Sequence, residues 1–493
     1  MTRARRRPTP WCRAAAASMA VVATLARAPG AARADGPADE DLPPSPPPDT
    51  GVPGPWITYA ARPTPSPGET RACSPRAPVC VHAPARTPPA TSLAALGAAE
   101  RAWETLTGAL GLPRPDLDDD LAYHLYLVAS APGTSLDLDA TYMYSRDVRA
   151  AGDRARTFAT LDASLHPGCM LDAAVTRAIA RAIVMRAAPA TSEGTALAQT
   201  TYLAELVVPC ALAFSAAEVS TFQRMATRAV CDTRAGEEGT APDDPPGAQG
   251  LGADRVQGRL ASARYARGGA LFWRRLDAAY AARPGALVMA TWALASTRTE
   301  VGARRWHDEP DAFDVLRESF KGALSTGSTI HDLFLDTAIA RAFAGSNDDG
   351  LHLRETVTLH DAGRVPIDWD LPWPTKPARF APRSPVHPSG ASYVVIRHAG
   401  APKGARLRAE ITWEEHALFR WAFVKLDAAG RELGRVVVPT PPRATEVQMT
   451  LAEVDDVDRI LLVGTNVGDP AYRFDPDDDV WEPHGWLLTI AAE

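Results

Sequence analysis

The chain has 493 residues, of which 46% are hydrophobic, 7% aromatic and 23% charged, and it contains 44 prolines. This length is enough for two or three domains with cores of their own, and the composition is that of a soluble globular protein. The formal net charge of −7 argues against nucleic acid or an anionic membrane surface as the partner, because both require clustered positive charge.

Residues 1–34 predict a secretory signal peptide. Five arginines precede or open the apolar run Ala14–Ala26, and Ala32-Arg33-Ala34 fits the small-x-small cleavage rule. The run is too short to span a bilayer, and no later run is long enough, so we expect no transmembrane segment. The alternative is a disordered Arg/Ala-rich leader. Because residues 1–34 hold seven arginines and no acidic residue, their removal takes the formal charge from −7 to −14.

Residues 35–90 predict a proline-rich linker or lead-in. They contain sixteen prolines, including PPSPPP at 43–48, and such a segment cannot build a core of its own. From Trp56 to His82 aromatic and β-branched residues return, so part of this stretch is expected to lie as a strand against the next domain.

Residues 91–364 predict a mainly helical α+β domain. Apolar residues recur at three- and four-residue steps from Leu93 to Leu110, which indicates a helix, and the β-prone run 123–130 indicates a strand. A pair of helices follows within 169–210. Further helices are expected at 216–231, 262–282, 285–297, from 310 and at 330–344, with a long exposed loop at 232–258.

The last third of the chain predicts a β-sandwich. Residues 365–385 are rich in proline and are expected to link the two domains. Residues 386–493 contain seven short alternating or apolar runs separated by turn residues, at the spacing typical of an antiparallel sandwich. The predicted fold is therefore α+β, with a mainly helical domain followed by an antiparallel β-sandwich domain.

Export would permit disulfide bonds. Cys73 and Cys80 are close in sequence and form a natural local pair. Cys169 and Cys210 stand at the outer ends of the helix pair, and a turn that reverses the chain would bring them to the same end. We therefore predict a second disulfide between them. Cys231 is left unpaired or pairs elsewhere.

The helix pair has an apolar stripe on its first helix. Val175, Ile179 and Ile183 stand four residues apart and are expected to face a close neighbour. Arg177 and Arg181, also four apart, lie on another face. The two helices therefore predict a tightly packed part of the fold.

In its layout the chain resembles the gluzincin-type peptidases, and more narrowly the exported metalloprotease-like proteins of myxobacterial type. The shared features are a signal peptide, a proline-rich lead-in, a helix–strand start, a helix pair and a C-terminal sandwich. In that family the first helix carries HExxH and the second begins near a Glu-Gly pair whose Glu binds zinc. The resemblance places these functions on Arg177-Ala178-Ile179-Ala180-Arg181 and on Glu193-Gly194.

The residues at these positions depart from the family pattern. Zinc needs a lone pair from imidazole, thiolate or carboxylate, and the guanidinium groups of Arg177 and Arg181 have none to give. Ala178 removes the general base that would activate water. None of the eleven histidines forms HExxH or HxxEH, and Glu193 follows Arg181 by only twelve residues. We therefore expect no zinc and no catalytic residues, and read the four positions as a degenerate metal site.

An ordinary helix pair explains the same residues without a peptidase ancestor. In that interpretation Arg177 and Arg181 are solvated, and Glu193 is favoured in the first turn of its helix by the macrodipole.

Two other groups of residues suggest binding chemistry. Asp475, Asp477 and Asp479 could hold calcium, although a solvated turn between strands explains them as well, and residues 116–120 (DLDDD) have the same two interpretations. Six tryptophans could stack on sugars or pack in the core and between domains: Trp369, Trp373, Trp413, Trp421, Trp481 and Trp486. Their alternation favours packing. No GxSxG motif or phosphate-binding glycine loop occurs, so we expect no cofactor.

Together these patterns predict an exported protein of the periplasm or extracellular space that is an inactive relative of metalloproteases. Its role would be binding or structural, with a protein or glycan partner and no nucleic acid. The alternatives are a secreted hydrolase whose active site the spacing does not reveal, and a glycan-binding module in which Trp481 and Trp486 contact the sugar.

Overall fold

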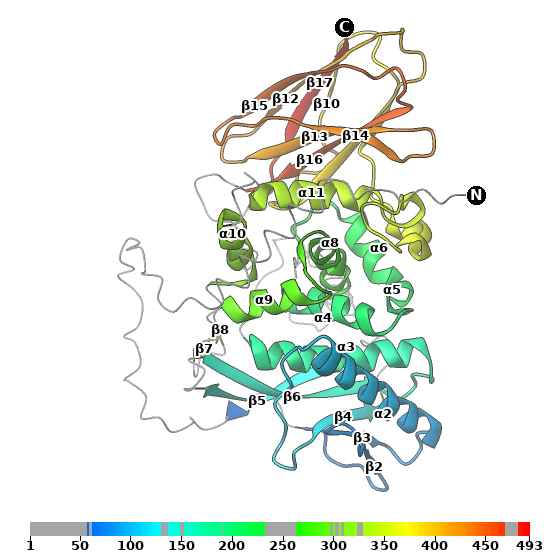
Figure 1. Ribbon diagram of the computed structural model, residues 1–493, viewed down its shortest axis with the longest axis vertical. Helices are drawn as coiled ribbons and strands as arrows, with labels where there is room; N and C mark the ends of the chain where they lie inside the picture. The colour runs from blue at the N-terminus through cyan, green and yellow to red at the C-terminus, as the bar shows by residue number, and fades with distance from the viewer. Residues whose placement is uncertain are drawn as a thin grey trace, which may run out of the picture. The chain divides into compact units, whose positions relative to one another are not determined.

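The computed structural model (Figure 1) describes residues 57–58, 62–129, 137–147, 152–189, 191–230, 232, 263–295, 299–300, 305–306, 310–322, 329–468 and 482–493. The signal peptide, Cys231, the 475–479 aspartates and Trp481 lie outside these residues, as does nearly all of the expected loop 232–258. The fold is α+β, as the sequence predicts.

The chain divides into two compact units. The first comprises Met1–Thr191, Leu206–Val208 and Asp277–Thr326, and the second comprises Ser192–Glu205, Pro209–Leu276 and Gly327–Glu493. The domain boundaries predicted from composition, 91–364 and 386–493, stay predictions.

The first unit contains a six-stranded mixed sheet in the order β1-β5-β6-β4-β3-β2. Its strands are β1 (Ile57–Thr58), β2 (Thr70–Cys73), β3 (Val79–Ala83), β4 (Tyr123–Val128), β5 (Asp137–Asp147) and β6 (Gly152–Asp162). β3, β4 and β6 run parallel, and the other pairs are antiparallel. The strand predicted at 123–130 is confirmed as β4.

The hairpin of β5 and β6 lies in a stretch to which the sequence patterns assign no element. Both strands alternate polar and apolar residues, but several of the polar residues are charged (DLDATYMYSRD and GDRARTFATLD), which lowers the β signal of the sequence. Antiparallel pairing over nearly the whole length of both strands stabilises them instead.

Two helices, α2 (Pro89–Trp103) and α3 (Cys169–Ala187), cover one face of this sheet (Figure 1). Tyr123 on β4 points to that side, and its hydroxyl donates to the carbonyl oxygen of Ala178 on α3 at 3.1 Å. Two details of the expected first helix were wrong. Leu93 is exposed rather than part of the apolar face, and the α-helix ends at Trp103, followed by a π-helical turn, η1 (Glu104–Ala109).

The remaining helices are close to the predicted ones. In the first unit these are α9 (Ala286–Leu294) and α10 (Ala312–Gly322), together with the short strands β7 (Thr299–Glu300) and β8 (Arg305–Trp306). The others are α4 (Glu193–Val207), α5 (Ala211–Phe214), α6 (Ala216–Arg224), α8 (Ala270–Tyr280) and α11 (Ile330–Ala342), with the 3-10 turns η3 (Gly345–Asn347) and η4 (Val357–Gly363). The helix expected at 216–231 is shorter than predicted, since α6 ends at Arg224.

The second unit ends in a two-sheet sandwich whose strands include all seven predicted runs. One sheet has the order β14 (Glu432–Val437), β13 (Phe419–Leu426), β16 (Arg459–Asn466), β11 (Ala391–Arg397) and β9 (Trp369–Leu371). The other has the order β10 (Ala378–Phe380), β17 (Trp486–Ala492), β12 (Leu407–Trp413) and β15 (Glu446–Leu451). All pairs are antiparallel except β9 with β11. The segment 365–385, expected to be a linker, supplies an edge strand to each sheet.

Helix α11 packs against the five-stranded sheet within the second unit (Figure 1). Leu335 and Ile339 of the helix join Val424 and Val463 of the sheet in one buried cluster. Tyr393 on β11 is fully buried there, and its hydroxyl donates to the carbonyl oxygen of Ala338 at 2.8 Å. Burial raises the pKa of Tyr393 to about 12, so this phenol donates throughout the physiological range. The sandwich is thus anchored directly to a helix.

Candidate functional site

The positions at which the resemblance to gluzincin peptidases predicts HExxH lie within α3, and their side chains do not fit a metal. Arg177 is only 4% exposed and Ala178 only 3% exposed, so the interpretation of Arg177 as a solvated side chain was wrong. Arg181 is partly buried. Glu193 begins α4, and its side chain lies outside the described residues. Because a guanidinium has no lone pair, we derive no metal chemistry from these positions.

The apolar stripe of α3 is confirmed. Val175, Ile179 and Ile183 are completely buried. They stand beside Arg177 on the same helix, so α3 is buried around most of its circumference rather than along a narrow stripe. The helix therefore belongs to the core of the first unit.

The cysteines follow the predicted pattern where the structure describes them. Cys73 and Cys80 form a disulfide that joins β2 to β3 at directly paired positions. Cys169 and Cys210 are both disulfide-bonded as well. The pairing of Cys169 with Cys210 stays a prediction.

Most of the tryptophans of the sandwich pack in its core. Trp413, Trp421 and Trp486 are 7%, 0% and 3% exposed, and Trp421 meets Trp486 edge to face with ring centroids 5.5 Å apart. Trp373 is also buried, and Trp369 is half-buried. Core packing, one of the two alternatives, is therefore confirmed for the buried rings, which present little face to a sugar.

A groove opens in the sandwich where the pairing of two strands is interrupted. β10 stops pairing with β17 at Phe380, opposite Leu488, and an isolated bridge resumes the pairing at Val386, opposite His484. Between these points five residues of one segment lie opposite three of the other. Two prolines in the longer segment lack the N–H that would continue the ladder, so this segment bulges away from the sheet.

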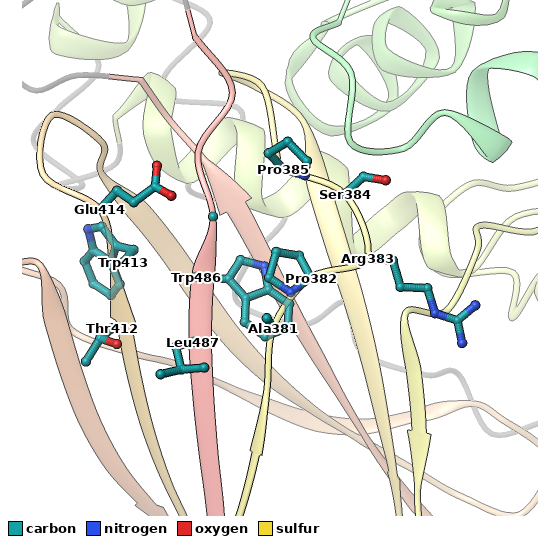
Figure 2. Close-up of a pocket in the computed structure, with 11 residues that line it drawn as sticks. Ala381, Pro382, Arg383, Ser384, Pro385, Thr412, Trp413, Glu414, Trp486 and Leu487 are labelled. Carbon is teal, nitrogen blue, oxygen red and sulfur yellow. The ribbon is translucent and has the colours of Figure 1, made fainter.

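The groove has a volume of about 490 Å³ and combines apolar surfaces with two opposite charges. Figure 2 shows Glu414 and Trp413 on one side and the bulged segment with Arg383 on the other. Trp486 and Leu487 of β17 lie between these two sides. The groove can therefore contact an apolar group centrally and a polar group on each side.

The two charged side chains of the groove are oriented by neighbouring residues. The guanidinium of Arg383 lies over the ring of Trp369, 5.6 Å from its centroid. The Glu414 carboxylate lies 2.9 Å from Nδ1 of His484. Both side chains are exposed, so their charges are available to a ligand.

A second group of polar residues lies on the sheet of the first unit, on the face opposite α2 and α3. The register of the parallel strands pairs Cys80 with His124 and His82 with Tyr126, and side chains at paired positions share a face. Arg71 on β2 is paired with His82 and joins the same face. Two histidines from successive parallel strands are thus brought together.

These histidines form a continuous hydrogen-bonded chain between carboxylates. Glu69 Oε1 lies 2.9 Å from His82 Nδ1, and His82 Nε2 lies 2.9 Å from His124 Nδ1. On the far side His124 Nε2 is 3.0 Å from Asp120 Oδ1 and 3.8 Å from Asp118 Oδ2. The side chains of His124 and Asp118 are each 4% exposed, whereas Asp120 reaches solvent.

The surroundings shift the pKa values of this group. Burial lowers the pKa of His82 below 6.5, against the opposing effect of Glu69. Burial also raises the pKa of Tyr126, whose ring stacks on His82 with centroids 4.4 Å apart. Burial acts to raise the pKa of Asp120, but hydrogen bonds from His124 and Arg71 outweigh it and lower the value. The site therefore favours a neutral His82 beside an ionised carboxylate.

Sequence reasoning missed this group. The interpretation of 116–120 as a solvated turn was wrong for Asp118, which is buried. The available signal was one histidine in each of two strands joined by a helix, since such a unit forms adjacent parallel strands. The partial strand expected within 56–82 had no bounds, so the two histidines could not be assigned to neighbouring positions.

The second unit holds another buried histidine in a polar group. His352 Nδ1 lies 2.9 Å from Asp349 Oδ2, and His352 Nε2 lies 2.8 Å from Glu432 Oε2. Arg435 donates to both oxygens of Glu432 at 2.7 Å. Burial alone would raise the pKa of Glu432, but the hydrogen bonds from His352 and Arg435 lower it to about 2. This group connects the loop after α11 to β14.

No protein-family model and no curated protein matches the chain. Among solved structures, the VP2 subviral particle of infectious bursal disease virus is similar, at 8% identity and a TM-score of 0.16. The similarity covers 24% of this chain and 33% of the viral chain, and at this TM-score it carries no argument about fold or function. Among the helices of the described residues, none is long and apolar enough to cross a membrane.

Proposed function

We propose that this chain is an exported, non-catalytic binding protein that resembles a gluzincin peptidase in layout and lacks its zinc centre. The buried Arg177 and Ala178 support this proposal, because the resemblance predicts a zinc ligand and a general base at these positions and neither side chain can serve as one. Four disulfide-bonded cysteines support an oxidising compartment, either the periplasm or the exterior of the cell.

The ligand site that we propose is the groove of the sandwich. Its volume lies in the usual range for ligand sites, and it combines apolar walls with a few polar groups, as such sites do. The buried faces of Trp413 and Trp486 favour a polypeptide over a sugar, since sugars need an open aromatic face. We propose an extended segment of a partner protein, with an apolar side chain between a basic residue facing Glu414 and an acidic residue facing Arg383.

The absence of catalysis is tested by incubating the purified chain with casein and with peptide libraries, with and without added zinc. We expect no cleavage products by mass spectrometry under either condition. Cleavage that a chelator abolishes would contradict the proposal and favour a secreted hydrolase with an unrecognised active site.

The ligand site is tested by selecting peptides from a random display library on the immobilised chain and measuring their affinity for variants. Arg383→Glu and Glu414→Lys should each weaken binding roughly tenfold, because each places a like charge against the ligand. Lys403→Glu changes an exposed charge of the sandwich outside the groove and should leave the affinity unchanged. Peptides that bind all variants equally would rule out the groove, and sugars on a glycan array that bind in place of peptides would assign it to a glycan.

A further inference from the structure

We infer that Asp118, Asp120 and His124 form a binding site for a divalent transition metal, for which zinc is the best match. Their ligand atoms all lie within 4.8 Å of one another. In a tetrahedral zinc site with bonds of about 2.0–2.1 Å, neighbouring ligand atoms stand roughly 3.3 Å apart. The distances from His124 Nε2 to the two aspartates, 3.0 and 3.8 Å, bracket this value.

The hydrogen-bonded chain behind His124 supplies the orientation that a metal ligand needs. Three contacts join the two imidazoles to each other and to Glu69 and Asp120, and each contact needs one hydrogen. Two neutral imidazoles carry two N–H groups, and ionised carboxylates carry none. The third contact therefore needs either an added proton or another cation.

A zinc ion on His124 Nε2 completes this chain with both rings neutral. His124 Nδ1 then donates to His82 Nε2, and His82 Nδ1 donates to Glu69 Oε1. Zinc takes the place of the hydrogen that His124 otherwise directs at Asp120. This is the arrangement in which a metal-bound histidine is held by a second hydrogen bond that ends on a carboxylate. His82 and Glu69 are thus positioning residues for the ligand.

Asp118 has a buried carboxylate oxygen that already faces a cation, the guanidinium of Arg62. Its Oδ1 accepts from the backbone N–H of Asp119 at 2.9 Å, whereas its Oδ2 is buried and accepts no hydrogen bond. The guanidinium of Arg62 forms an ion pair with this oxygen. Because the side chain of Arg62 is 38% exposed, it can move into solvent when a cation binds Asp118.

The donor set favours zinc over calcium. Calcium takes six to eight oxygen ligands, whereas this site offers one imidazole nitrogen and two carboxylates. Arg71 pairs with Oδ2 of Asp120, which leaves Oδ1 for the metal. The exposed side of Asp120 leaves space for a water molecule as the fourth ligand.

The test is equilibrium dialysis of the full chain, stripped of metal with a chelator, against zinc chloride. We expect one zinc per chain, with the affinity reduced at least 100-fold in His124→Ala and in Asp120→Asn. His82→Gln should weaken it roughly tenfold to 100-fold, as for a positioning residue. Arg62→Ala should tighten binding roughly tenfold, because it removes a competing positive charge. His166→Ala, which changes an exposed histidine, is the control with unchanged affinity.

A second measurement separates metal binding from folding defects. Cobalt substituted for zinc should give a visible absorption spectrum typical of four ligands, which disappears in Asp120→Asn while the melting curve of the metal-free protein stays that of the wild type. No zinc in the wild type, or equal zinc in wild type and Asp120→Asn, would overturn the site. Neither result bears on the groove, so the metal site and the proposed ligand site stand or fall separately.

Discussion

Each of the two units contains a buried histidine with polar partners on both ring nitrogens, and the partners differ. His352 lies between two carboxylates, and its ring stacks on Phe343 with centroids 4.0 Å apart. Nη2 of Arg435 also lies 2.7 Å from Nε2 of His352, so a guanidinium already accompanies this nitrogen and its carboxylate. His124 has a carboxylate on one side and a second histidine on the other, so two neutral rings cannot supply all the hydrogens.

This difference separates a structural cluster from a cation site. The His352 cluster is closed by Arg435, which occupies both oxygens of Glu432. In the His124 cluster, Asp118 and Asp120 each keep one carboxylate oxygen near Nε2 of His124. Residue types are therefore a poor guide to function, and the second partner of the histidine decides between the two roles.

The largest effect on stability is expected from breaking the His352 cluster. Glu432→Ala would leave the partly buried Arg435 and the buried His352 without their shared carboxylate, and we expect a loss of about 2–3 kcal/mol, below the roughly 3–5 kcal/mol of a fully buried pair. Urea unfolding should show this loss, and Glu446→Ala, at an exposed position on β15, is the control. A loss below about 0.5 kcal/mol would mean that the cluster contributes little to the unit.

The next largest effect is the stabilisation of the His124 cluster by zinc. Zinc at 100 times its Kd should stabilise the first unit by about 2.7 kcal/mol, because it binds the folded state only. Thermal melting with and without zinc measures this shift. It should vanish in His124→Ala and persist in Glu432→Gln. An equal zinc-dependent shift in His124→Ala would place the metal elsewhere.

A smaller loss of stability is expected from removing the disulfide between Cys73 and Cys80, which lies beside the His124 cluster. Cys73 and Cys80 are separated by seven positions, and a loop of this length contributes roughly 2 kcal/mol in the loop-entropy model. The double variant Cys73→Ser/Cys80→Ser should lower the melting temperature accordingly and leave the His352 cluster unaffected. Unchanged melting would show that the hairpin of β2 and β3 does not need the bond.

The smallest effect is a difference in acid sensitivity between the units. Because the pKa of His82 is lowered in the folded chain, the unfolded chain binds more protons at this residue than the folded chain does. The contribution of neutral His82 to stability is therefore present above pH 6.5 and is lost as the pH falls below this value. The pKa of Glu432 falls from 4.5 to about 2, so its effect is lost only between these values. The free energy of unfolding, measured with urea at pH 7.5 and at pH 5.5, should fall more between these pH values in the wild type than in His82→Gln. Equal losses in both would contradict the assignment to His82.

The sequence predicted much of the fold because its strongest signals are local. The seven runs of the sandwich alternate clearly, and the helix pair has a regular apolar spacing, so both were predicted. The hairpin of β5 and β6 was missed because charged residues obscure its alternation and long-range pairing stabilises it. The proline-rich segment 365–385 has the composition of a linker but forms an edge strand in each sheet.

The sites were harder to predict because they depend on contacts between distant residues. His82 and His124 are 42 positions apart and meet only through the register of β3 and β4. The groove arises from an interruption of strand pairing that no motif encodes. By contrast, the unsuitability of Arg177 and Ala178 for zinc follows from their side-chain chemistry alone, because neither side chain can donate a lone pair in any fold.

The most direct test of the comparison is anomalous diffraction at the zinc edge from crystals grown with zinc. We expect a single strong peak between Asp118, Asp120 and His124, and no peak at His352. A peak at His352, or none near His124, would contradict the distinction between the two clusters.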